Sequence, residues 1–415
     1  MKVLPGRICG EINIIPSKSH THRLLICAAL SKTSTTIRCP LASDDILHTK
    51  NCLNVLCADI EETGNGFLVD PRFPDDAPVL PCGESGSTYR FLLPVAAALG
   101  INARFILKGR LPDRPMDALF ETLEAHGVSV NGRNTGEVHI AGKLRGGEFH
   151  LPGDISSQFV SGLLLAAPLT GEDCAIVLTS PLQSKGYVDM TLEAVRAFGI
   201  RAETSRDRIF IPGGQNYVSP GHVTAQGDWS NAAVWLCAAA AGGDRVSVTG
   251  LSLSSPQGDK AIIDVLRAFH AQVVAEEGKV TVDLSALVAA DIDISDTPDL
   301  APAIALLCLK ARGTSVMKGA GRLRLKESDR AQSITDTLRT LGGDAFIDSD
   351  RLVIRGKGAL AGGTCNAFND HRIVMMAACS AVLAQNPIEI AGSEAVNKSY
   401  PNFFDDLRIL GIRTE

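Results

Sequence analysis

Ser17-Lys18-Ser19-His20 is a polar loop that runs directly into a long apolar stretch, and five similar junctions follow it along the chain. The later junctions begin at Glu84, Asp154, Asp228, Asp296 and Asn369, so the spacings are 67, 70, 74, 68 and 73 residues. Ser, Asp and Asn are favoured at helix N-caps, and each junction therefore predicts a helix start. Helix starts present backbone N–H groups and a positive dipole end, both of which favour anions. The sequence thus predicts six related units with anion-binding helix starts.

Each apolar helix is followed by a short strand, an amphipathic helix and a hairpin. The predicted strands are Thr35–Arg38, Arg104–Leu107, Ala175–Leu178, Val246–Thr249 and Ser315–Lys318. The hairpin turns are predicted at Gly64-Asn65-Gly66, Gly132-Arg133-Asn134, Arg206-Asp207, Glu277-Gly278 and Ser349-Asp350. The repeat is therefore α-β-α-β-β, and its last strand leads into the next junction.

The sixth unit stops at Leu410-Gly411-Ile412, where the other units begin a hairpin. The stretch Val3–Ile14 is the only unused strand-like segment, and we expect it to complete the last unit. The predicted domains are therefore 15–226 and 1–14 with 227–415, each holding three units. An open solenoid is a less favourable arrangement, because its ends would need capping units.

Several of the apolar helices carry almost no polar residues, and a helix that is apolar on all sides must be buried on all sides. The clearest examples are Leu163–Pro168, Ala232–Ala241, Ala301–Leu309 and Ile373–Ala384. We expect each domain to hold three such helices inside a layer of sheets, with the helix starts emerging at one end.

Composition excludes several functional classes. The chain has 415 residues, 45% hydrophobic and 21% charged, which is typical of a folded globular protein. No apolar run approaches the ~20 residues of a membrane span, and Met1–Arg7 contains no secretory apolar region. The eleven cysteines form no metal-ligand spacing, which favours free thiols in a cytoplasmic protein without a metal or other cofactor. The net charge of −6 argues against a nucleic-acid-binding surface.

The charged motifs occupy the same phase of the repeat. Lys326-Glu327-Ser328-Asp329-Arg330 alone is typical of a solvated helix start with local ion pairs, and Asn369-Asp370-His371-Arg372 alone is typical of a helix cap. Because the motifs recur at equivalent positions, we expect them to face one cleft.

These motifs, together with Asp113-Arg114-Pro115-Met116, Ser156-Ser157-Gln158-Phe159 and Asn397–Pro401, closely resemble the 5-enolpyruvylshikimate-3-phosphate (EPSP) synthase family over the whole chain. The resemblance implies a two-domain inside-out α/β barrel with six repeats of a βαβαββ-type unit, three per domain. It also implies transfer of the enolpyruvyl group of phosphoenolpyruvate to the 5-hydroxyl of shikimate 3-phosphate, with release of phosphate. The implied protein is a cytoplasmic monomer that acts on small molecules, without a nucleic-acid or membrane partner.

The resemblance also implies the binding residues, since two phosphorylated acids need a concentration of Lys and Arg. Those implied for phosphoenolpyruvate are Lys18, Gly86, Arg90, Arg114, Gln158, Arg330, His371, Arg372 and Lys398. Those implied for shikimate 3-phosphate are Lys18, Ser19, Arg23, Ser156, Ser157, Gln158, Ser184, Tyr187, Asp299 and Lys326.

Two proton transfers require catalytic groups. Asp299 matches the family's proton acceptor for the 5-hydroxyl, and Glu327 is the candidate proton shuttle, with Lys18 assisting. Asp44-Asp45 is interpreted as a structural cap and hinge contact rather than a catalytic pair, and Asp228 as a cap and hinge.

Three other functions are weighed against this one. A UDP-N-acetylglucosamine enolpyruvyl transferase shares the repeat but uses a loop cysteine, and Gly109–Arg114 contains none. An RNA 3′-phosphate cyclase would show a basic surface. A non-catalytic anion-binding scaffold has no need of Asp299 and Glu327 among its cations.

Overall fold

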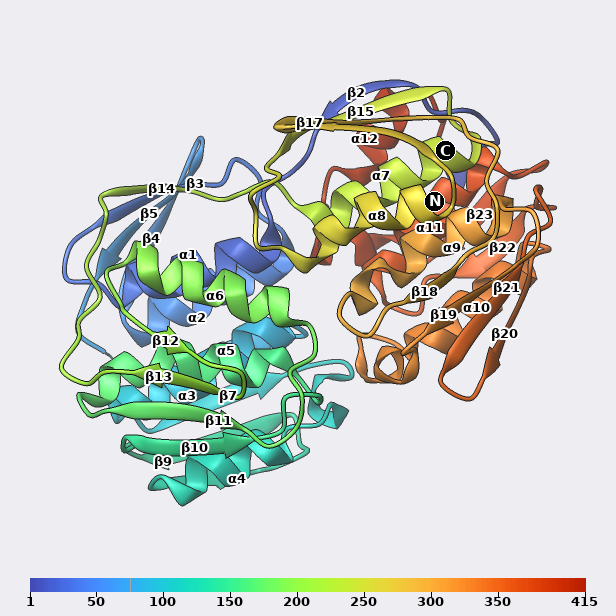
Figure 1. Ribbon diagram of the computed structural model, residues 1–415. Coiled ribbons are helices and arrows are strands. Elements are labelled where there is room, and N and C mark those ends of the chain that lie inside the picture. Colours follow the sequence, from blue (N-terminus) through green and yellow to red (C-terminus); the bar gives the residue numbers. More distant parts are fainter. Residues whose placement is uncertain (75) are drawn as a thin grey trace. The chain divides into compact units, whose positions relative to one another are not determined.

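The computed structural model describes residues 1–74 and 76–415, which form two compact units (Figure 1). Pro16–Ala225 is one stretch of chain, which we call the continuous unit. Met1–Ile15 and Gln226–Glu415 together form the second, which we call the split unit. Among the described residues, no helix combines the length and apolar character that spanning a bilayer requires.

The helices of the continuous unit alternate between two kinds. Those that begin at the predicted junctions are α1 (Lys18–Ala29), α3 (Gly86–Leu99) and α5 (Ser157–Ala166). Those that follow them are α2 (Asp44–Leu56), α4 (Asp117–Ala125) and α6 (Lys185–Ala197), with short 3-10 helices η1 (Leu111–Asp113) and η2 (Ala167–Thr170). Ser17, Ser85 and Ser156 cap the junction helices through side-chain oxygens that accept backbone N–H groups.

Three mixed sheets of four strands belong to the continuous unit. In spatial order the first contains β14 (His222–Thr224), β3 (Thr35–Arg38), β5 (Gly66–Pro71) and β4 (Ala58–Thr63). The second contains β6 (Val79–Gly83), β7 (Ala103–Leu107), β9 (Glu137–Gly142) and β8 (Val128–Asn131). The third contains β10 (Gly147–Leu151), β11 (Cys174–Leu178), β13 (Arg208–Ile211) and β12 (Glu203–Thr204). In each sheet the first pair is parallel and the rest antiparallel.

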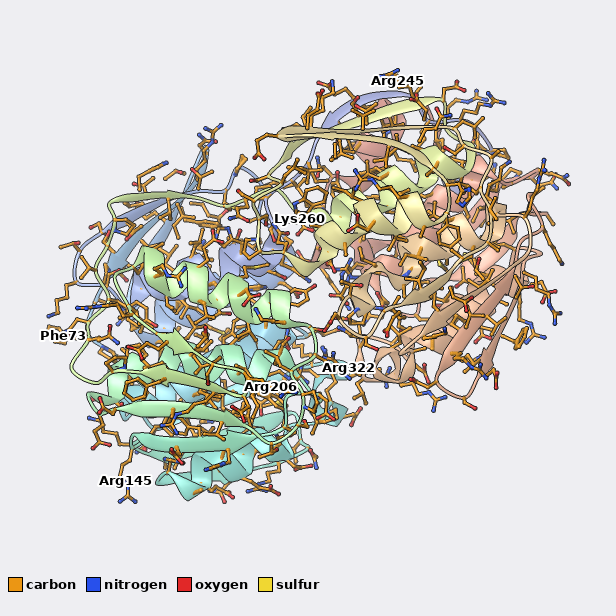
Figure 2. All side chains as sticks on the ribbon, in the orientation of Figure 1. Phe73, Arg145, Arg206, Arg245, Lys260 and Arg322 are labelled. Atoms are coloured by element: carbon orange, nitrogen blue, oxygen red, sulfur yellow. The ribbon has the colours of Figure 1, made fainter. Side chains whose placement is uncertain are left out.

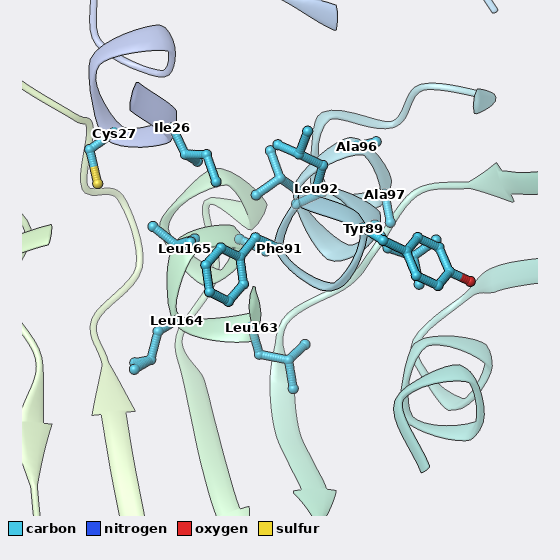
Figure 3. Close-up of a cluster of buried hydrophobic side chains, with 14 of the residues drawn as sticks. Ile26, Cys27, Tyr89, Phe91, Leu92, Ala96, Ala97, Leu163, Leu164 and Leu165 are labelled. Carbon is cyan, nitrogen blue, oxygen red and sulfur yellow. The ribbon is translucent and has the colours of Figure 1, made fainter. Parts of the chain in front are cut away.

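The core of the continuous unit lies between its junction helices. Figure 3 shows Ile26 of α1, Phe91 of α3 and Leu164 of α5 in one cluster, and each is at most 1% exposed. A side chain at Gly162 would begin only 2.3 Å from the carbonyl oxygen of Arg90, so this glycine allows α5 to approach α3 closely. The prediction that apolar helices form the core is confirmed here.

The split unit repeats the same plan. Its junction helices are α7 (Trp229–Gly242), α9 (Ala301–Lys310) and α11 (His371–Cys379), and the helices that follow them are α8 (Ile262–Ala268), α10 (Arg330–Thr340) and α12 (Phe403–Ile409). The 3-10 helices are η3 (Gly258–Ala261), η4 (Pro298–Leu300), η5 (Gly321–Leu325), η6 (Ser380–Val382) and η7 (Ser393–Lys398).

Its sheets use both ends of the chain. One contains β16 (Gln272–Glu276), β17 (Gly278–Asp283), β15 (Arg245–Leu251) and β2 (Gly10–Asn13). The next contains β18 (Asp291–Asp293), β19 (Thr314–Lys318), β21 (Arg351–Arg355) and β20 (Asp344–Asp348). The last contains β1 (Lys2–Val3), β23 (Ile388–Ala391) and β22 (Gly363–Asn366). Lys2 and Glu415 exchange two backbone hydrogen bonds of 2.8 Å, so the termini are paired (Figure 1).

The strands that precede α1 and α7 are exchanged between the units. β2 leads into α1 of the continuous unit, yet it pairs in parallel with β15 of the split unit. β14 leads into α7 of the split unit, yet it pairs in parallel with β3 of the continuous unit. The prediction that the stretch Val3–Ile14 completes the last unit is therefore only partly right: β1 pairs with β23 in the last sheet, whereas β2 pairs with β15 in the first sheet of the split unit.

The predicted strands and turns are confirmed, and the junctions predicted at α5 and α11 contain their caps, Ser156 and Asp370. One helix start and two helix ends differ in detail. The predicted helical segment Leu163–Pro168 leaves the α conformation at Ala167, where η2 begins. α9 begins at Ala301 after the 3-10 turn η4, so Asp296 does not cap it. The predicted helix Ile373–Ala384 leaves the α conformation at Ser380, whose hydroxyl donates to the carbonyl oxygen of Met376 (2.8 Å).

Candidate active site

Two arginine side chains converge on the start of α3, and we call Arg90 and Arg114 the arginine pair. A Cβ atom built on Gly86 would lie 2.8 Å from Nη1 of Arg114 and 3.3 Å from Nη1 of Arg90. The guanidinium groups therefore occupy the space that a larger residue would fill. Two positive groups beside a helix start produce a strongly positive potential, which suits a phosphate or carboxylate group.

Arg90 is held in place by neutral groups and is 3% exposed. Its Nη1 donates to Oε1 of Gln158 (2.8 Å), and its guanidinium lies 5.6 Å from the ring centre of Phe159. Nε2 of Gln158 in turn donates to Oγ of Ser87 (2.9 Å). This chain of contacts ties the first turns of α3 and α5 together and fixes where Arg90 points.

Lys18, at the start of α1, forms an ion pair with Asp45 in the first turn of α2 (Nζ–Oδ2, 2.8 Å). Both side chains are largely buried, with 12% and 13% exposed. The interpretation of Asp44-Asp45 as a cap is wrong, because Ser43 occupies the N-cap position. Asp45 instead fixes the ammonium group of Lys18.

Arg23 is a buried cation surrounded by neutral oxygens. Its guanidinium donates to Oγ1 of Thr191 (2.7 Å), to the carbonyl oxygens of Ser19 (2.6 Å) and Tyr187 (2.9 Å), and to Oγ of Ser161 (3.3 Å). It also lies 4.8 Å from the ring centre of Phe91. Burial lowers the pKa of Arg23 to about 10. A cation in these surroundings gains from the arrival of an anion, because no carboxylate among the described residues pairs with it.

The split unit contains a cluster of six charged residues that we call the carboxylate–arginine cluster. Its members are Asp299, Lys326, Glu327, Arg330, Asp370 and Arg372. Arg330, which is 1% exposed, lies at its centre and forms ion pairs with three carboxylates: Asp299 (2.7 Å), Glu327 (2.5 Å) and Asp370 (2.9 Å). Charge attraction to these groups outweighs burial and raises the pKa of Arg330.

Asp299 lies among three cations. Its carboxylate contacts Arg330 (2.7 Å), Lys326 (3.0 Å) and Arg372 (3.4 Å). Burial would raise the pKa of Asp299, but the three cations together hold it well below its usual range. In this arrangement Asp299 is ionised and binds a proton weakly.

Lys326 and Glu327 sit at the border of the cluster. Their side chains are 19% and 24% exposed, compared with 1% for Arg330. Burial lowers the pKa of Lys326, while attraction to Asp299 opposes that effect. These two side chains are therefore the most exposed of the cluster, and Asp299 follows at 17%.

Asp370 organises the start of α11. Its Oδ1 accepts the backbone N–H of Arg372 (2.9 Å), and its Oδ2 accepts the Ser328 hydroxyl (3.1 Å). His371 is buried at 2% exposure, and Nζ of Lys398 donates to the carbonyl oxygen of Asn369 (2.8 Å). The loop before α11 thus joins Lys398 to the carboxylate–arginine cluster.

The predicted site residues separate between the two units. The continuous unit holds Lys18, Ser19, Arg23, Gly86, Arg90, Arg114, Ser156, Ser157, Gln158, Ser184 and Tyr187. The split unit holds Asp299, Lys326, Glu327, Arg330, His371, Arg372 and Lys398. In the continuous unit Arg90 contacts Gln158, and Arg23 contacts Ser19 and Tyr187; in the split unit Asp299 contacts Lys326, Arg330 and Arg372.

Sequence reasoning missed the roles of two carboxylates: Asp45 as the partner of Lys18, and Asp370 as a partner of Arg330. Asp370 and Asp45 stood inside the quoted motifs, but their partners lie 40 and 27 residues away. The sequence did contain one signal for Asp45. Two aspartates begin the helix that follows the Lys18 helix, so a carboxylate was available in the same unit to pair with that lysine.

Comparison with known proteins supplies the family. Residues 4–407 match the family model of EPSP synthase (3-phosphoshikimate 1-carboxyvinyltransferase). The 3-phosphoshikimate 1-carboxyvinyltransferase of Methanocorpusculum labreanum is 38% identical, and the match covers 99% of each chain. The protein of the same name from Clostridium kluyveri is 36% identical over 99% of this chain and 97% of its own.

A solved structure of EPSP synthase from Acinetobacter baumannii matches with a TM-score of 0.82 and 26% identity. The match covers 99% of this chain and 98% of that one. The enolpyruvyl transferase NikO from Streptomyces tendae matches with a TM-score of 0.80 and 19% identity, which shows the fold alone. The predicted fold class is confirmed.

Proposed function

Because this chain belongs to the EPSP synthase family, we propose that the charged clusters of its two units bind phosphoenolpyruvate and shikimate 3-phosphate. The protein is a 3-phosphoshikimate 1-carboxyvinyltransferase of the shikimate pathway to aromatic amino acids. It transfers the enolpyruvyl group from phosphoenolpyruvate to the 5-hydroxyl of shikimate 3-phosphate and releases phosphate. The alternative function, a UDP-N-acetylglucosamine enolpyruvyl transferase, has less support, because both relatives reported above are named 3-phosphoshikimate 1-carboxyvinyltransferase.

The observation that carries the site proposal is the convergence of Arg90 and Arg114 on Gly86 at the start of α3. Phosphoenolpyruvate carries a phosphate and a carboxylate, and a guanidinium fork fits either group. In the proposal this pair binds phosphoenolpyruvate together with Lys18 and Gln158. The split unit contributes Arg330, His371, Arg372 and Lys398.

Arg23 supports the proposed site for shikimate 3-phosphate. The neutral oxygens around it leave its positive charge uncompensated, and an anionic substrate would compensate it. In the proposal it binds with Lys18, Ser19, Ser156, Ser157, Gln158, Ser184 and Tyr187, while Lys326 and Asp299 act from the split unit.

The proposed proton transfers depend on the cations around Asp299. While Lys326, Arg330 and Arg372 surround it, Asp299 is too weak a base for a hydroxyl group. Arriving phosphate and carboxylate groups compete for the same cations, so the proton affinity of Asp299 rises as the substrates bind. Asp299 then accepts the 5-hydroxyl proton, and Glu327, with Lys18 assisting, exchanges the proton of the methylene carbon.

The wider organisation also belongs to the proposal. The two compact units support the predicted domains 15–226 and 1–14 with 227–415, each with three repeats. We infer that the protein works as a cytoplasmic monomer on small molecules, without nucleic acid or cofactor.

Phosphate release tests the function. Purified protein given phosphoenolpyruvate should release phosphate only when shikimate 3-phosphate is also present, and UDP-N-acetylglucosamine should not replace it. Asp299→Ala should lower kcat at least about 100-fold, while shikimate 3-phosphate still binds in calorimetry. Asp296→Ala, an exposed neighbour, is the control. Release without shikimate 3-phosphate, or an active Asp299→Ala variant, would contradict the proposal.

A further inference from the structure

Thr191 is a buried threonine on α6, which packs against α1 and α5. Its side chain is 0% exposed, and Val188, Leu192 and Val195 fall on the same face of the helix at helical spacing. A valine in its place would fill the same space without burying a hydroxyl group, and a buried hydroxyl costs free energy unless it is hydrogen-bonded. The hydroxyl of Thr191 therefore calls for an explanation.

A contact within α6 does not account for this hydroxyl by itself. It lies 3.0 Å from the carbonyl oxygen of Tyr187, one turn earlier, and 2.8 Å from Oγ of Ser161 on α5, and its single hydrogen can go to either. Its oxygen also accepts the Nε–H of Arg23 (2.7 Å), a charged donor. The hydroxyl thus connects α6 to a cation on α1.

Arg23 differs from most arginines of a folded protein in being buried. Figure 2 labels Arg145 and Arg206 of the same unit, and both are exposed. Arg23 is 1% exposed, and burial lowers its pKa only to about 10, so it stays charged at neutral pH. All of its hydrogen-bond acceptors described above are neutral oxygens, which leave its charge uncompensated.

Four of the five N–H bonds of the Arg23 guanidinium have acceptors in the protein. The Nε–H donates to Thr191, one N–H of Nη1 donates to the carbonyl oxygen of Ser19 (2.6 Å), and the two of Nη2 donate to the carbonyl oxygen of Tyr187 (2.9 Å) and to Oγ of Ser161 (3.3 Å). Within residues 1–74 and 76–415, no group accepts the fifth N–H, which is on Nη1.

The direction of this fifth N–H follows from the other four. A guanidinium group is planar and rigid, so acceptors on Nε and Nη2 determine the orientation of the whole group. Arg23 can then offer an anion one N–H of Nη1, but not the two parallel N–H bonds of a bidentate contact. The hydroxyl groups of Thr191 and Ser161 therefore help to decide where that N–H points.

We propose that Thr191, together with Ser161, is a positioning residue for the transfer reaction: it holds the guanidinium of Arg23 so that one N–H of Nη1 is directed at an anionic oxygen of shikimate 3-phosphate. The inference rests on the proposed role of Arg23 in binding that substrate. It adds two neutral side chains that do not touch the substrate but set the position of a residue that does.

Thr191→Val tests the proposal, because valine keeps the shape of threonine but accepts no hydrogen bond. The KM for shikimate 3-phosphate should rise about tenfold, through loss of a hydrogen bond from a charged donor. The KM for phosphoenolpyruvate and kcat should each change less than about twofold, because the lost contact serves the binding of one substrate. Calorimetric titration with shikimate 3-phosphate alone should show the same loss of affinity.

Two further variants separate positioning from a general effect on folding. Thr191→Ser keeps the hydroxyl and should restore the KM for shikimate 3-phosphate. Thr122→Val on α4 is the matched control, since Thr122 is 6% exposed and its hydroxyl also donates to the carbonyl oxygen one turn earlier, that of Ala118 (2.7 Å). Its other contact is the carbonyl oxygen of His150 (3.1 Å), so the control should lower stability but leave both KM values unchanged.

Ser161→Ala provides a second, milder variant. It removes the acceptor of one N–H of Nη2, whose contact at 3.3 Å is longer than that of Thr191 with Nε at 2.7 Å. The KM for shikimate 3-phosphate should therefore rise less than in Thr191→Val, by about threefold. If Thr191→Val does not fold, Ser161→Ala decides alone, and an unchanged KM for shikimate 3-phosphate in that variant overturns the inference.

A measurement without substrates tests the contact itself. In nitrogen-15 spectra of the free enzyme, the Nε–H signal of Arg23, identified by its absence from Arg23→Lys, should exchange slowly with solvent and should exchange faster in Thr191→Val. An unchanged exchange rate, an equal rise of both KM values in Thr191→Val, or a failure of Thr191→Ser to restore binding would overturn the inference. If the wild-type enzyme itself releases no phosphate with both substrates, the proposed function fails instead.

Discussion

Arg330 shows how a single residue can determine the arrangement of several functional groups. It is buried and pairs with Asp299, Glu327 and Asp370, which come from three different segments of the split unit. Each of its guanidinium nitrogens donates to at least one carboxylate oxygen. Its first effect is therefore to hold the two proposed catalytic carboxylates in place.

Arg330→Ala should destabilise the protein by about 3–5 kcal/mol, since it leaves buried carboxylates without their cation. Arg330→Lys should recover only part of this loss, because an ammonium group cannot reproduce three directed contacts. Urea denaturation measures the change. Arg339→Ala, an exposed position on the same helix, is the control and should cost less than about 0.5 kcal/mol. Equal effects at the two positions would contradict the central role of Arg330.

Asp259 and Asp299 should affect stability in opposite directions with pH. The folded-state pKa of Asp299 lies below its unfolded value, so its contribution is present above about pH 4 and is lost as pH falls further. Burial raises the pKa of Asp259 from 3.8 to about 6, so its contribution is present below about pH 4 and is lost as pH rises through 6.

The substitution Asp259→Asn should therefore stabilise the folded protein, relative to wild type, increasingly as pH rises. Relative to wild type, its free energy of unfolding should increase by up to about 3 kcal/mol between pH 4 and pH 7, since each pKa unit corresponds to about 1.4 kcal/mol. Urea denaturation at the two pH values measures the difference. A pH-independent difference would contradict the buried, ionisable state of Asp259, and Asp264→Asn should show no such trend because its side chain is 81% exposed.

At the scale of elements, the starts of the junction helices are not equivalent. The start of α3 has two guanidinium groups beside it, that of α11 has Asp370 and Arg372, and that of α7 has the carboxylates of Asp228 and Asp259. The same backbone geometry therefore serves opposite charges, and the side chains around it decide which ion it attracts.

Gly86→Ala tests the start of α3. The new methyl group would lie 2.8 Å from Nη1 of Arg114, which must move away. We expect the KM for phosphoenolpyruvate to rise about tenfold, equivalent to about 1.4 kcal/mol of binding, while the KM for shikimate 3-phosphate changes little. Gly64→Ala, where nothing lies within 4 Å of the added atom, is the matched control. An unchanged KM for phosphoenolpyruvate would place that substrate elsewhere.

Periodicity predicted the repeated elements because it reports local properties. The strand Thr35–Arg38 is found with the predicted bounds, and the turn Gly64-Asn65-Gly66 joins β4 to β5. Apolar runs such as Ala232–Ala241 are fully buried, as their composition requires. These features depend on residues that are close together in the sequence, so the sequence alone is sufficient to predict them.

The features that sequence reasoning missed depend on distant partners. Pro298 begins the 3-10 turn η4, which moves the start of α9 to Ala301 and places Asp299 among cations that come from later segments. Asp259 is a single acid beside Lys260, a pattern typical of an exposed loop, so the sequence does not predict its burial. Only the packing of η3 against α7 brings it to the hydroxyl of Ser230.

At the scale of the molecule, the exchange of β2 and β14 means that one unit is built from a single stretch of chain and the other from two. Residues 16–225 contain every strand of the three sheets of the continuous unit. Residues 226–415 lack β1 and β2, so two sheets lose a strand each.

We therefore expect a fragment of residues 16–225 to fold cooperatively alone, whereas a fragment of residues 226–415 should need a peptide of residues 1–15. Circular dichroism during urea denaturation, with the peptide titrated in, measures both effects. A peptide carrying Ile12→Lys, whose native side chain is 5% exposed, is the control and should not restore stability. A 226–415 fragment that is equally stable with and without the peptide would contradict this expectation.

The pairing of the termini has a consequence for how the protein is made. Residues 1–15 leave the ribosome long before β23, the partner of β1, which ends at Ala391. At the usual speed of translation this delay is on the order of a minute. Meanwhile Val3 of β1, which is fully buried in the finished protein, has no partner strand. β1 therefore stays unpaired until β23 has been made, and a chaperone that shields its apolar side chain would raise the yield of folded enzyme.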